Sequence, residues 1–304
     1  ISENSNHGHT NIYSYLPEEK ATALVHQLYS FPGHDSTVRV LKEPAPNIVF
    51  IQLESFTADV VKQLGGDSGI TPVLSRLIDD GLFFTNIYSS GVRTDQGIIA
   101  LLSGFPAQPQ TSIIYQPDKI EHLPFLSLAC RKKGYQNNFY YGGELAFGRF
   151  NTIAYHAGFD RIIGKNDFSD ARQFNKWGVD DLSLFEKFAR ESKTFSQPFF
   201  SYIITSSSHE PFTVPIEPVF RGNSLEEKFK NACYFTDQSL GVLLDSVKSS
   251  EWYKHTLFVL VADHGHVLPK NRKFDEPARY HIPLLFFGEA LKEEYRGVKI
   301  TTLG

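Results

Sequence analysis

Six short runs of branched and aromatic residues recur along this chain, and they constrain its fold more than any other feature. They span residues 47–53, 82–88, 136–141, 199–205, 256–262 and 282–287. A run such as NIVFIQL, at 47–53, is typical of a strand that is buried on both faces. Strands of that kind occur mainly in parallel sheets, because helices cover both faces of such a sheet.

Helical patterns lie between these runs. We expect helices over residues 71–80, 95–102, 125–133, 180–191 and 225–249, with a further one around 17–29. The pattern at 225–249 is the clearest, because five side chains recur at helical steps and form one apolar stripe: Phe229, Cys233, Leu240, Leu244 and Val247. Strands that alternate with helices predict an α/β fold, with a mostly parallel central sheet flanked by helices on both faces.

The composition fits one large α/β domain. The chain has 304 residues, of which 41% are hydrophobic and 21% charged, as in ordinary globular proteins. The formal net charge is -4 and no block of Lys or Arg is present, which excludes the electrostatic footprint of a nucleic-acid-binding protein. Cys130 and Cys233 are either free and buried or paired, and the sequence leaves both alternatives open.

The two ends of the sequence look like cuts in a longer protein. Residues 1–45 are polar and irregular, so we expect a lead-in or linker before a catalytic domain at 46–304. No stretch approaches the roughly 20 apolar residues of a membrane span, and no signal-peptide pattern opens the chain. Because the chain begins at Ile1 in a polar stretch and ends at Gly304 after a strand-like VKITTLG, we expect a truncated C-terminus and an absent N-terminal membrane region.

Polar residues follow three of the predicted strands abruptly. They are Glu54, the segment 207–210 (SSHE) and the segment 263–266 (DHGH). In α/β sheets the functional groups gather just beyond the carboxyl ends of the strands, so these positions are candidates for a site. Asp263 and His264 offer an acid and an imidazole that suit a divalent cation, and Gly265 permits a sharp turn. Alternatively, they are a capping acid and a surface histidine.

Glu54 and Thr94 extend this candidate site. Glu54 is either a further metal ligand or an ordinary exposed acid in a loop. Thr94 lies in SGVRTDQG at a predicted helix start, where the helix dipole favours a phosphate and a cation would activate the hydroxyl as a nucleophile. Thr and Asp are also common N-cap residues, so a structural role is the alternative. His209, in TSSSHEPF, either holds a phosphate, protonates a leaving group or is structural.

The ordered set Glu54, Arg93-Thr94, His209-Glu-Pro-Phe and Asp263-His264-Gly265 resembles the lipoteichoic acid synthase and phosphoglycerol transferase family. That family belongs to the alkaline phosphatase/sulfatase superfamily. The resemblance runs from about Asn47 to about Leu291, and its motifs occur in the family's order. The segments SGFPAQP and YYGGEL look most like the branch found in Bacteroidetes-type bacteria.

The resemblance implies a metal-dependent transferase. By position, Glu54, Thr94, Asp263 and His264 would hold one divalent metal, most often Mn²⁺, with Mg²⁺ or Zn²⁺ as alternatives. Thr94 would attack a phospholipid such as phosphatidylglycerol, release diacylglycerol and pass the phosphoglycerol group to an acceptor hydroxyl. Members of the family carry N-terminal transmembrane helices and expose this domain outside the bacterial cytoplasmic membrane. The implied partners are a phospholipid donor and the membrane surface.

The resemblance also suggests substrate-binding residues. His209 matches the family's phosphate-binding histidine, and Arg93 would reach a phosphate or an acid. The family's His-Gly-acid segment, with its following Trp and Arg, corresponds here to residues 140–147, which lack the His and the Trp. Glu144 would replace part of that polar network. His266 and His281 either complete a second metal or phosphate site or serve in packing.

Three other functions are alternatives to a transferase. The same site would serve a phosphodiesterase or phosphatase that passes the group to water. A sulfatase is disfavoured, because residues 93–97 (RTDQG) lack the Cys or Ser and the Pro-x-Arg of the sulfatase motif. A non-catalytic envelope-binding domain is the remaining alternative, and it is disfavoured because every residue of the implied metal set is present.

Overall fold

A computed structural model of the chain describes residues 16–30, 37–108, 111–168 and 176–303. The chain divides into two compact units, with the boundary between Arg39 and Val40. In the first unit, helix α1 spans Glu18–Tyr29, where the sequence predicts a helix. The polar opening at residues 1–11 lies outside the described residues. No helix in the described ranges has both the length and the apolar character that crossing a membrane requires.

The second unit is built on a single eight-stranded sheet, counted over the described residues. Its strands are β1 Asn47–Leu53, β2 Leu82–Tyr88, β3 Gln136–Tyr141, β4 Arg161–Ile163, β5 Phe199–Ile204, β6 Thr256–Ala262, β7 His281–Phe287 and β8 Lys299–Leu303. Their order is β4-β3-β5-β1-β6-β7-β2-β8. Only β7 runs against its neighbours, pairing antiparallel with β6 and β2. The prediction of a mostly parallel sheet is therefore confirmed.

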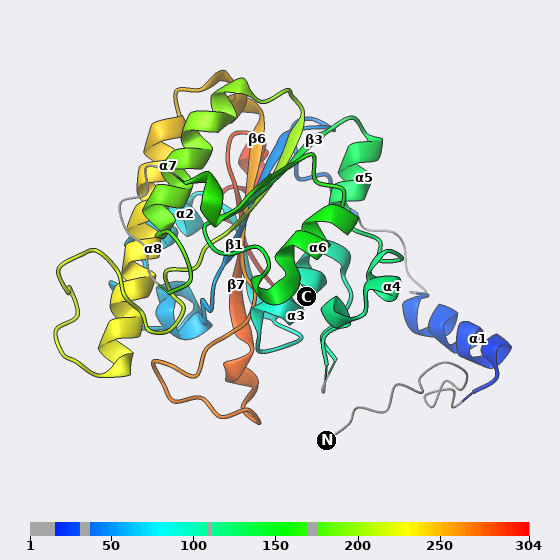
Figure 1. Cartoon of the computed structure of the whole chain (residues 1–304), viewed down its shortest axis with the longest axis horizontal. Helices are drawn as coiled ribbons and strands as arrows, with labels where there is room; N and C mark the ends of the chain where they lie inside the picture. Colours follow the sequence, from blue (N-terminus) through cyan, green and yellow to red (C-terminus); the bar gives the residue numbers. More distant parts are fainter. Residues whose placement is uncertain (1–15, 31–36, 109–110, 169–175, 304) are drawn as a thin grey trace. The chain divides into compact units, whose positions relative to one another are not determined.

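Helices cover both faces of this sheet. Figure 1 shows α2, α7 and α8 on one side and α3, α5 and α6 on the other. Their bounds are α2 Pro72–Asp79, α3 Thr94–Ser103, α4 Pro117–Ile120, α5 Leu126–Lys132, α6 Phe150–His156, α7 Asp181–Glu191 and α8 Leu225–Val247. Helix α8 begins at a capping box, in which the Ser224 amide donates to the Glu227 carboxylate over 3.0 Å. Four of the five residues of its predicted stripe are buried, the exception being Leu244.

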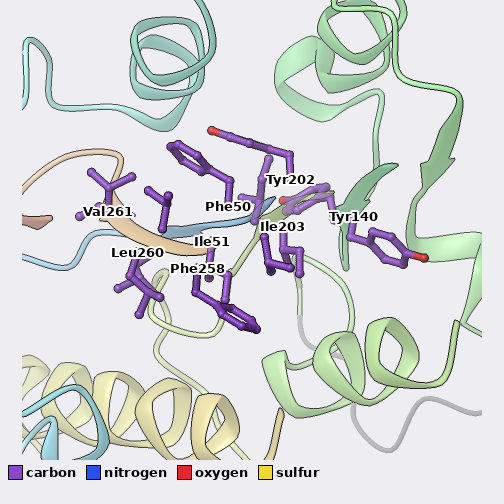
Figure 2. Close-up of a cluster of buried hydrophobic side chains, with 14 of the residues drawn as sticks. Phe50, Ile51, Tyr140, Tyr202, Ile203, Phe258, Leu260 and Val261 are labelled. Atoms are coloured by element: carbon purple, nitrogen blue, oxygen red, sulfur yellow. The ribbon is translucent and has the colours of Figure 1, made fainter. Parts of the chain in front are cut away.

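The core lies on both faces of the central strands. Every residue of β5 and β6 is buried, which explains why these runs are continuously apolar. Figure 2 shows that the labelled side chains project from both faces of the strands, toward the helices drawn above and below. On one face the rings of Phe50 and Tyr202 stack, with centroids 5.1 Å apart, because these residues are in register on β1 and β5.

The sequence patterns miss three short elements, β4, α4 and α6. Strand β4 has three residues and α4 has four, so neither is long enough to show a period. Helix α6 has seven residues, and its Phe150, Ile153 and Ala154 are buried at helical spacing. Elements this short are marginal in isolation and depend on tertiary contacts. Strand β4 pairs with β3, and α4 and α6 contact each other.

Cys130 on α5 and Cys233 on α8 are both free and buried. Of the two alternatives that the sequence leaves open, the structure supports free thiols. Burial raises the pKa of each thiol, so both are kept protonated and act as small apolar residues.

Asp237 on α8 caps the N-terminus of α2. Its two carboxylate oxygens accept from the amides of Val73 and Leu74, each over 2.8 Å. Since the first amides of a helix have no partner within the helix, a carboxylate from another element satisfies them and complements the dipole. This contact joins two helices on the same face of the sheet.

We therefore expect Asp237→Ala to lower the free energy of unfolding by about 2 kcal/mol, because two buried amides lose their acceptor. Urea denaturation of the purified chain measures the change. Asp245→Ala is the matched control, since Asp245 is exposed on the same helix and pairs with Lys248. A loss for Asp237→Ala as small as that of the control would contradict the assigned cap.

Candidate functional site

Three polar segments leave the sheet side by side at its carboxyl edge. Strand β1 pairs in parallel with β5 on one side and with β6 on the other. Thr205, Glu54 and Asp263 directly follow these strands. The Glu54 amide donates to the Thr205 hydroxyl over 2.9 Å, and the Asp263 amide donates to the carbonyl of Leu53 over 3.3 Å. The strand ends therefore bring together residues that are more than 200 positions apart in the sequence.

Glu54, Asp263 and His264 form a buried cluster at this edge. Each offers one ligand atom, and these atoms lie within 4.8 Å of one another. The Nε2 atom of His264 lies 3.7 Å from Glu54 Oε1 and 3.7 Å from Asp263 Oδ2. Two carboxylates and an imidazole are ligand types that divalent cations accept. The cluster could therefore hold one metal ion.

Hydrogen bonds around the cluster fix each ligand. Asp263 Oδ1 accepts from the amides of Ser55, over 3.0 Å, and His264, over 2.8 Å. Asp263 Oδ2 accepts from the Gln52 side chain over 3.2 Å. The Nδ1 atom of His264 lies 3.0 Å from the Gly265 carbonyl, which can only accept. Nδ1 therefore carries the proton, which leaves Nε2 as the nitrogen that can bind a metal.

Burial and the proximity of the two carboxylates dominate the electrostatics of the cluster. Burial, and then the charge of Glu54, raise the pKa of Asp263 to about 7. Burial also acts to raise the pKa of Glu54, but the charges of His264 and His209 and the hydroxyls of Ser55 and Thr94 lower it overall. Two carboxylates buried this close repel one another unless a cation or a proton lies between them. The residues present thus fit a divalent cation.

Thr94 is the first residue of α3 and joins this cluster. Its Oγ1 donates to Glu54 Oε2 over 2.9 Å and lies 3.5 Å from His264 Nε2. Gly97, one turn along the helix, permits this approach, because a Cβ at that position would lie 2.6 Å from the Asp263 backbone oxygen. The sequence analysis includes Gly97 in the motif but does not identify this role.

Ser55 adopts a left-handed backbone conformation, with φ 59°, directly after Glu54. Such a conformation is uncommon for a residue other than glycine and persists where surrounding contacts hold it. Here the Ser55 amide donates to Asp263, and its hydroxyl donates to Glu54 Oε1 over 2.6 Å. Ser55 therefore connects the two carboxylates, and no sequence pattern predicts this.

The predicted substrate-binding residues lie around the cluster but not within it. His209 is half-buried after β5, and its charge influences the pKa of Glu54. Arg93 is exposed, and its Nε donates to Asp95 over 3.1 Å. Glu144 is exposed, and its carboxylate accepts from the Ala146 amide over 3.4 Å. Their substrate contacts stay predictions.

His266 and His281 pack against different aromatic rings. The His266 ring stacks on Phe229, with centroids 4.5 Å apart, and burial together with the charge of Arg279 lowers its pKa to about 4. His281 Nε2 lies 2.7 Å from the Thr85 carbonyl, and its ring stacks on Tyr88. Within the described residues, the only group of three or more metal-ligand side chains is Glu54, Asp263 and His264. Neither histidine belongs to it.

A further carboxylate, Asp181, supports the segment that carries His209. Asp181 Oδ1 accepts from the Ser206 amide over 2.8 Å, and its Oδ2 accepts from the Thr236 hydroxyl over 2.6 Å. The side chain is fully buried at the start of α7. Burial outweighs these hydrogen bonds and raises its pKa to about 6. No sequence pattern indicates this role of Asp181, because an acid at a helix start is ordinary.

A surface hollow of about 540 Å³ lies at the opposite, amino edge of the sheet and is unrelated to the cluster. Its lining includes Lys42, Glu43 and His255, which precede β1 and β6. His255 pairs with Glu43 over 3.0 Å. Lys42 pairs with Glu293, outside the lining, over 2.8 Å. Opposite charges are therefore paired in and around the hollow, in contrast to the crowded carboxylates at the other edge.

Comparisons with known proteins concern the family and the fold of the chain. The family model described as Sulfatase matches residues 46–301. The chain is 23% identical over 227 residues to the lipoteichoic acid synthase-like protein YvgJ of Bacillus subtilis. That match covers 72% of this chain and 36% of the relative, so the chain spans about a third of that protein's length.

Two solved structures extend the comparison. A protein in the alkaline phosphatase superfamily from Vibrio parahaemolyticus superposes with a TM-score of 0.80 and 28% identity, over 95% of this chain and 72% of that one. The lipoteichoic acid synthase LtaP from Listeria monocytogenes superposes with a TM-score of 0.73 and 20% identity, over 85% of this chain and 68% of that one. At this identity the second likeness concerns the fold alone.

Glu54→Gln should weaken Mn²⁺ binding more than about 100-fold, because it removes a proposed metal ligand. Loss of a residue outside the ligand shell typically weakens metal binding by roughly 10- to 100-fold, and loss of a ligand should weaken it more. Isothermal titration calorimetry of the chain, after treatment with a chelator, measures the dissociation constant. Glu144→Gln is the control, because Glu144 is an exposed acid outside the cluster. Equal affinity in the wild type and Glu54→Gln would exclude Glu54 as a ligand.

Asp181 should make the stability of the fold depend on pH. Its pKa rises from 3.8 in the unfolded chain to about 6 in the folded protein, so its contribution to stability is complete below pH 3.8 and is lost as the pH rises to about 6. Relative to the wild type, Asp181→Asn should therefore gain about 2 kcal/mol of unfolding free energy between pH 4 and pH 7.

Urea denaturation at a series of pH values measures this difference. Asp245→Asn is the control, because Lys248 lowers the pKa of Asp245 and moves its titration below that window. A constant difference between Asp181→Asn and the wild type across the window would show that Asp181 does not titrate there.

Proposed function

The chain belongs to the sulfatase family of the alkaline phosphatase superfamily, and from this premise we propose that it is a metal-dependent transferase of phospholipid head groups. It moves phosphoglycerol, or a similar group, from a phospholipid through Thr94 to an acceptor in the cell envelope. The observation that carries the proposal is the hydrogen bond from the Thr94 hydroxyl to Glu54, within a buried set that includes Asp263 and His264. We assign the activity to residues 46–304, with residues 1–45 as a lead-in.

Glu54, Asp263 and His264 are the proposed metal ligands, together with the Thr94 hydroxyl. Mn²⁺ is the cation we expect, with Mg²⁺ and Zn²⁺ as alternatives. When bound, such a cation would supply positive charge that favours the deprotonated hydroxyl and stabilises charge on the phosphate. The crowding of Glu54 and Asp263, and the raised pKa of Asp263, support a cation at this position.

In the first step Thr94 attacks the phosphorus of the donor. Glu54 Oε2 accepts the hydroxyl proton, since these two atoms are already hydrogen-bonded. A bond forms between Thr94 Oγ1 and phosphorus, and the bond from phosphorus to the diacylglycerol oxygen breaks. The electron pair leaves with that oxygen, and His209 is the proposed proton donor to it. The N-terminus of α3 favours the negative charge of the phosphate.

In the second step an acceptor hydroxyl attacks the phospho-threonine. A bond forms between the acceptor oxygen and phosphorus, and the acceptor proton passes to His209, which gave up its own proton in the first step. The bond from phosphorus to Thr94 Oγ1 breaks, and the threonine regains a proton from Glu54. Water would complete the same step in a phosphodiesterase, which is the alternative that this geometry also serves. The relation to the lipoteichoic acid synthases of the sequence comparison favours the transferase.

A phospholipid donor requires a membrane surface. We propose that the protein works on the extracytoplasmic face of the bacterial cytoplasmic membrane, with transmembrane helices as its anchor, as the family resemblance implies. This part of the proposal concerns the whole protein and extends beyond the described residues.

Thr94→Ala should abolish the covalent intermediate. After incubation with Mn²⁺ and phosphatidylglycerol or phosphatidylethanolamine, the intact mass of the wild-type chain should rise by that of one head-group phosphate, whereas Thr94→Ala should show no adduct. Release of diacylglycerol should fall about a thousand-fold or more, because the nucleophile is absent.

Thr94→Ser is the matched control, since it keeps a hydroxyl at the same position and should form the adduct. The mass of the adduct identifies the donor. Wild-type turnover by Thr94→Ala would overturn the proposed nucleophile, and an adduct on a different residue would relocate it.

A further inference from the structure

A short segment, residues 177–181, crosses between the ends of β3 and β5, and we call it the 177–181 strap. On one side the Val179 amide donates to the Gly142 carbonyl over 3.0 Å, and Gly178 forms a bridge with Gly143. On the other side the Asp181 amide donates to the Ser207 hydroxyl over 2.9 Å. The strap is therefore bonded to the loops that follow two neighbouring strands.

The Asp181 end of the strap fixes the start of the segment that carries His209. The Asp181 carboxylate accepts from the amides of Ser206 and Ser207, over 2.8 Å and 3.3 Å. Ser208 follows directly and donates to the Glu54 carbonyl over 2.6 Å. The backbone from Ser206 to Ser208 is therefore hydrogen-bonded to the strap on one side, and Ser208 is hydrogen-bonded to Glu54, a proposed metal ligand, on the other.

The Trp177 end of the strap contacts His209 itself. The two rings lie with centroids 4.1 Å apart, at an interplanar angle of 53°. Phe147, from the segment after β3, also packs on Trp177, with ring centroids 5.0 Å apart, so the indole contacts a second ring besides His209. The indole N–H donates to the Glu210 carbonyl, next to His209 in the chain.

The same carbonyl lies 3.1 Å from the Nδ1 atom of His209. Because a carbonyl oxygen only accepts, this hydrogen bond requires a proton on Nδ1. Trp177 holds that carbonyl in place and packs on the ring, so it determines both the orientation of the imidazole and its tautomer. Nε2 is then the nitrogen that can exchange a hydrogen bond or proton with a substrate.

We propose that the 177–181 strap is a positioning element for His209, with Trp177 setting the ring and tautomer and Asp181 setting the backbone. The inference rests on the proposed function, in which His209 meets the phosphate or the leaving oxygen. Trp177 acts through His209 and is a positioning residue in this scheme. Its loss should therefore affect the reaction only as far as His209 contributes to it.

The tautomer is measured directly by nitrogen NMR of the chain labelled with ¹⁵N-histidine, in which His209→Ala identifies the signals of His209. In the wild type we expect the Nδ1-protonated form. In Trp177→Ala we expect a mixture of the two neutral tautomers, and in Trp177→Phe, which keeps a ring but lacks the indole N–H, an intermediate result. Tyr155→Ala, which removes an aromatic side chain that is 75% exposed, is the control and should leave the signals unchanged.

A double-mutant cycle tests the consequence for the reaction. With Mn²⁺ and fluorescent phosphatidylglycerol in micelles, Trp177→Ala should lower kcat about 10- to 100-fold, because misplacing a catalytic group by about 1 Å has effects of this size. The double variant Trp177→Ala/His209→Ala should be no slower than His209→Ala alone, since coupled residues are not additive. The melting temperature and Mn²⁺ affinity should stay at wild-type values, which separates positioning from unfolding.

Unchanged His209 signals in Trp177→Ala would overturn the inference, whatever the turnover. Fully additive losses in the double variant would also overturn it, because Trp177 would then act independently of His209. Failure of the proposed function is a separate result. In that case Thr94→Ala would retain wild-type turnover, or the wild type would release no diacylglycerol, while the NMR result would still decide the role of the strap.

Discussion

Strand β1 is hydrogen-bonded to parallel neighbours on both sides, and the geometry of the site depends on this arrangement. Parallel strands end at one edge of a sheet, so the segments after β5, β1 and β6 must leave it together. Strand β2 points the same way, because β7 runs antiparallel between it and β6. The loop after β2 therefore also starts at this edge and leads to Thr94. The sheet thus brings four distant motifs to one place.

Where these segments meet, the burial of charged side chains is the main free-energy cost to folding. Glu54 and Asp263 are both buried, and each would be strongly destabilised without partners. Hydrogen bonds from Ser55, Gln52 and Thr94 offset part of this penalty. The left-handed conformation of Ser55 adds local strain at the same point. Such features are typical of a region whose structure is determined by chemistry more than by stability.

The sequence predicts much of this arrangement, because strand and helix patterns are local. Buried runs and helical stripes indicate the long elements, and polar residues at strand ends indicate the neighbourhood of Glu54, Thr94, Asp263 and His264. Strand order and the antiparallel direction of β7 depend on pairing between distant segments, which no local pattern encodes. The different ring partners of His266 and His281 have the same origin, since Phe229 and Tyr88 come from distant segments. Trp177 and Asp181 also escape prediction, since their roles are set by partners about 30 positions away.

The contact at Gly97 has a mechanical consequence. Here the first turn of α3 lies against the backbone of Asp263 with no side chain between them. Repulsion between two backbones rises far more steeply on compression than a hydrogen bond weakens on stretching. The distance between Thr94 and the loop that carries Asp263 therefore has a lower limit that heating or ligand binding cannot change. Any closure of the site during a reaction cycle must therefore come from the surrounding loops, because α3 and the loop that carries Asp263 cannot approach each other further.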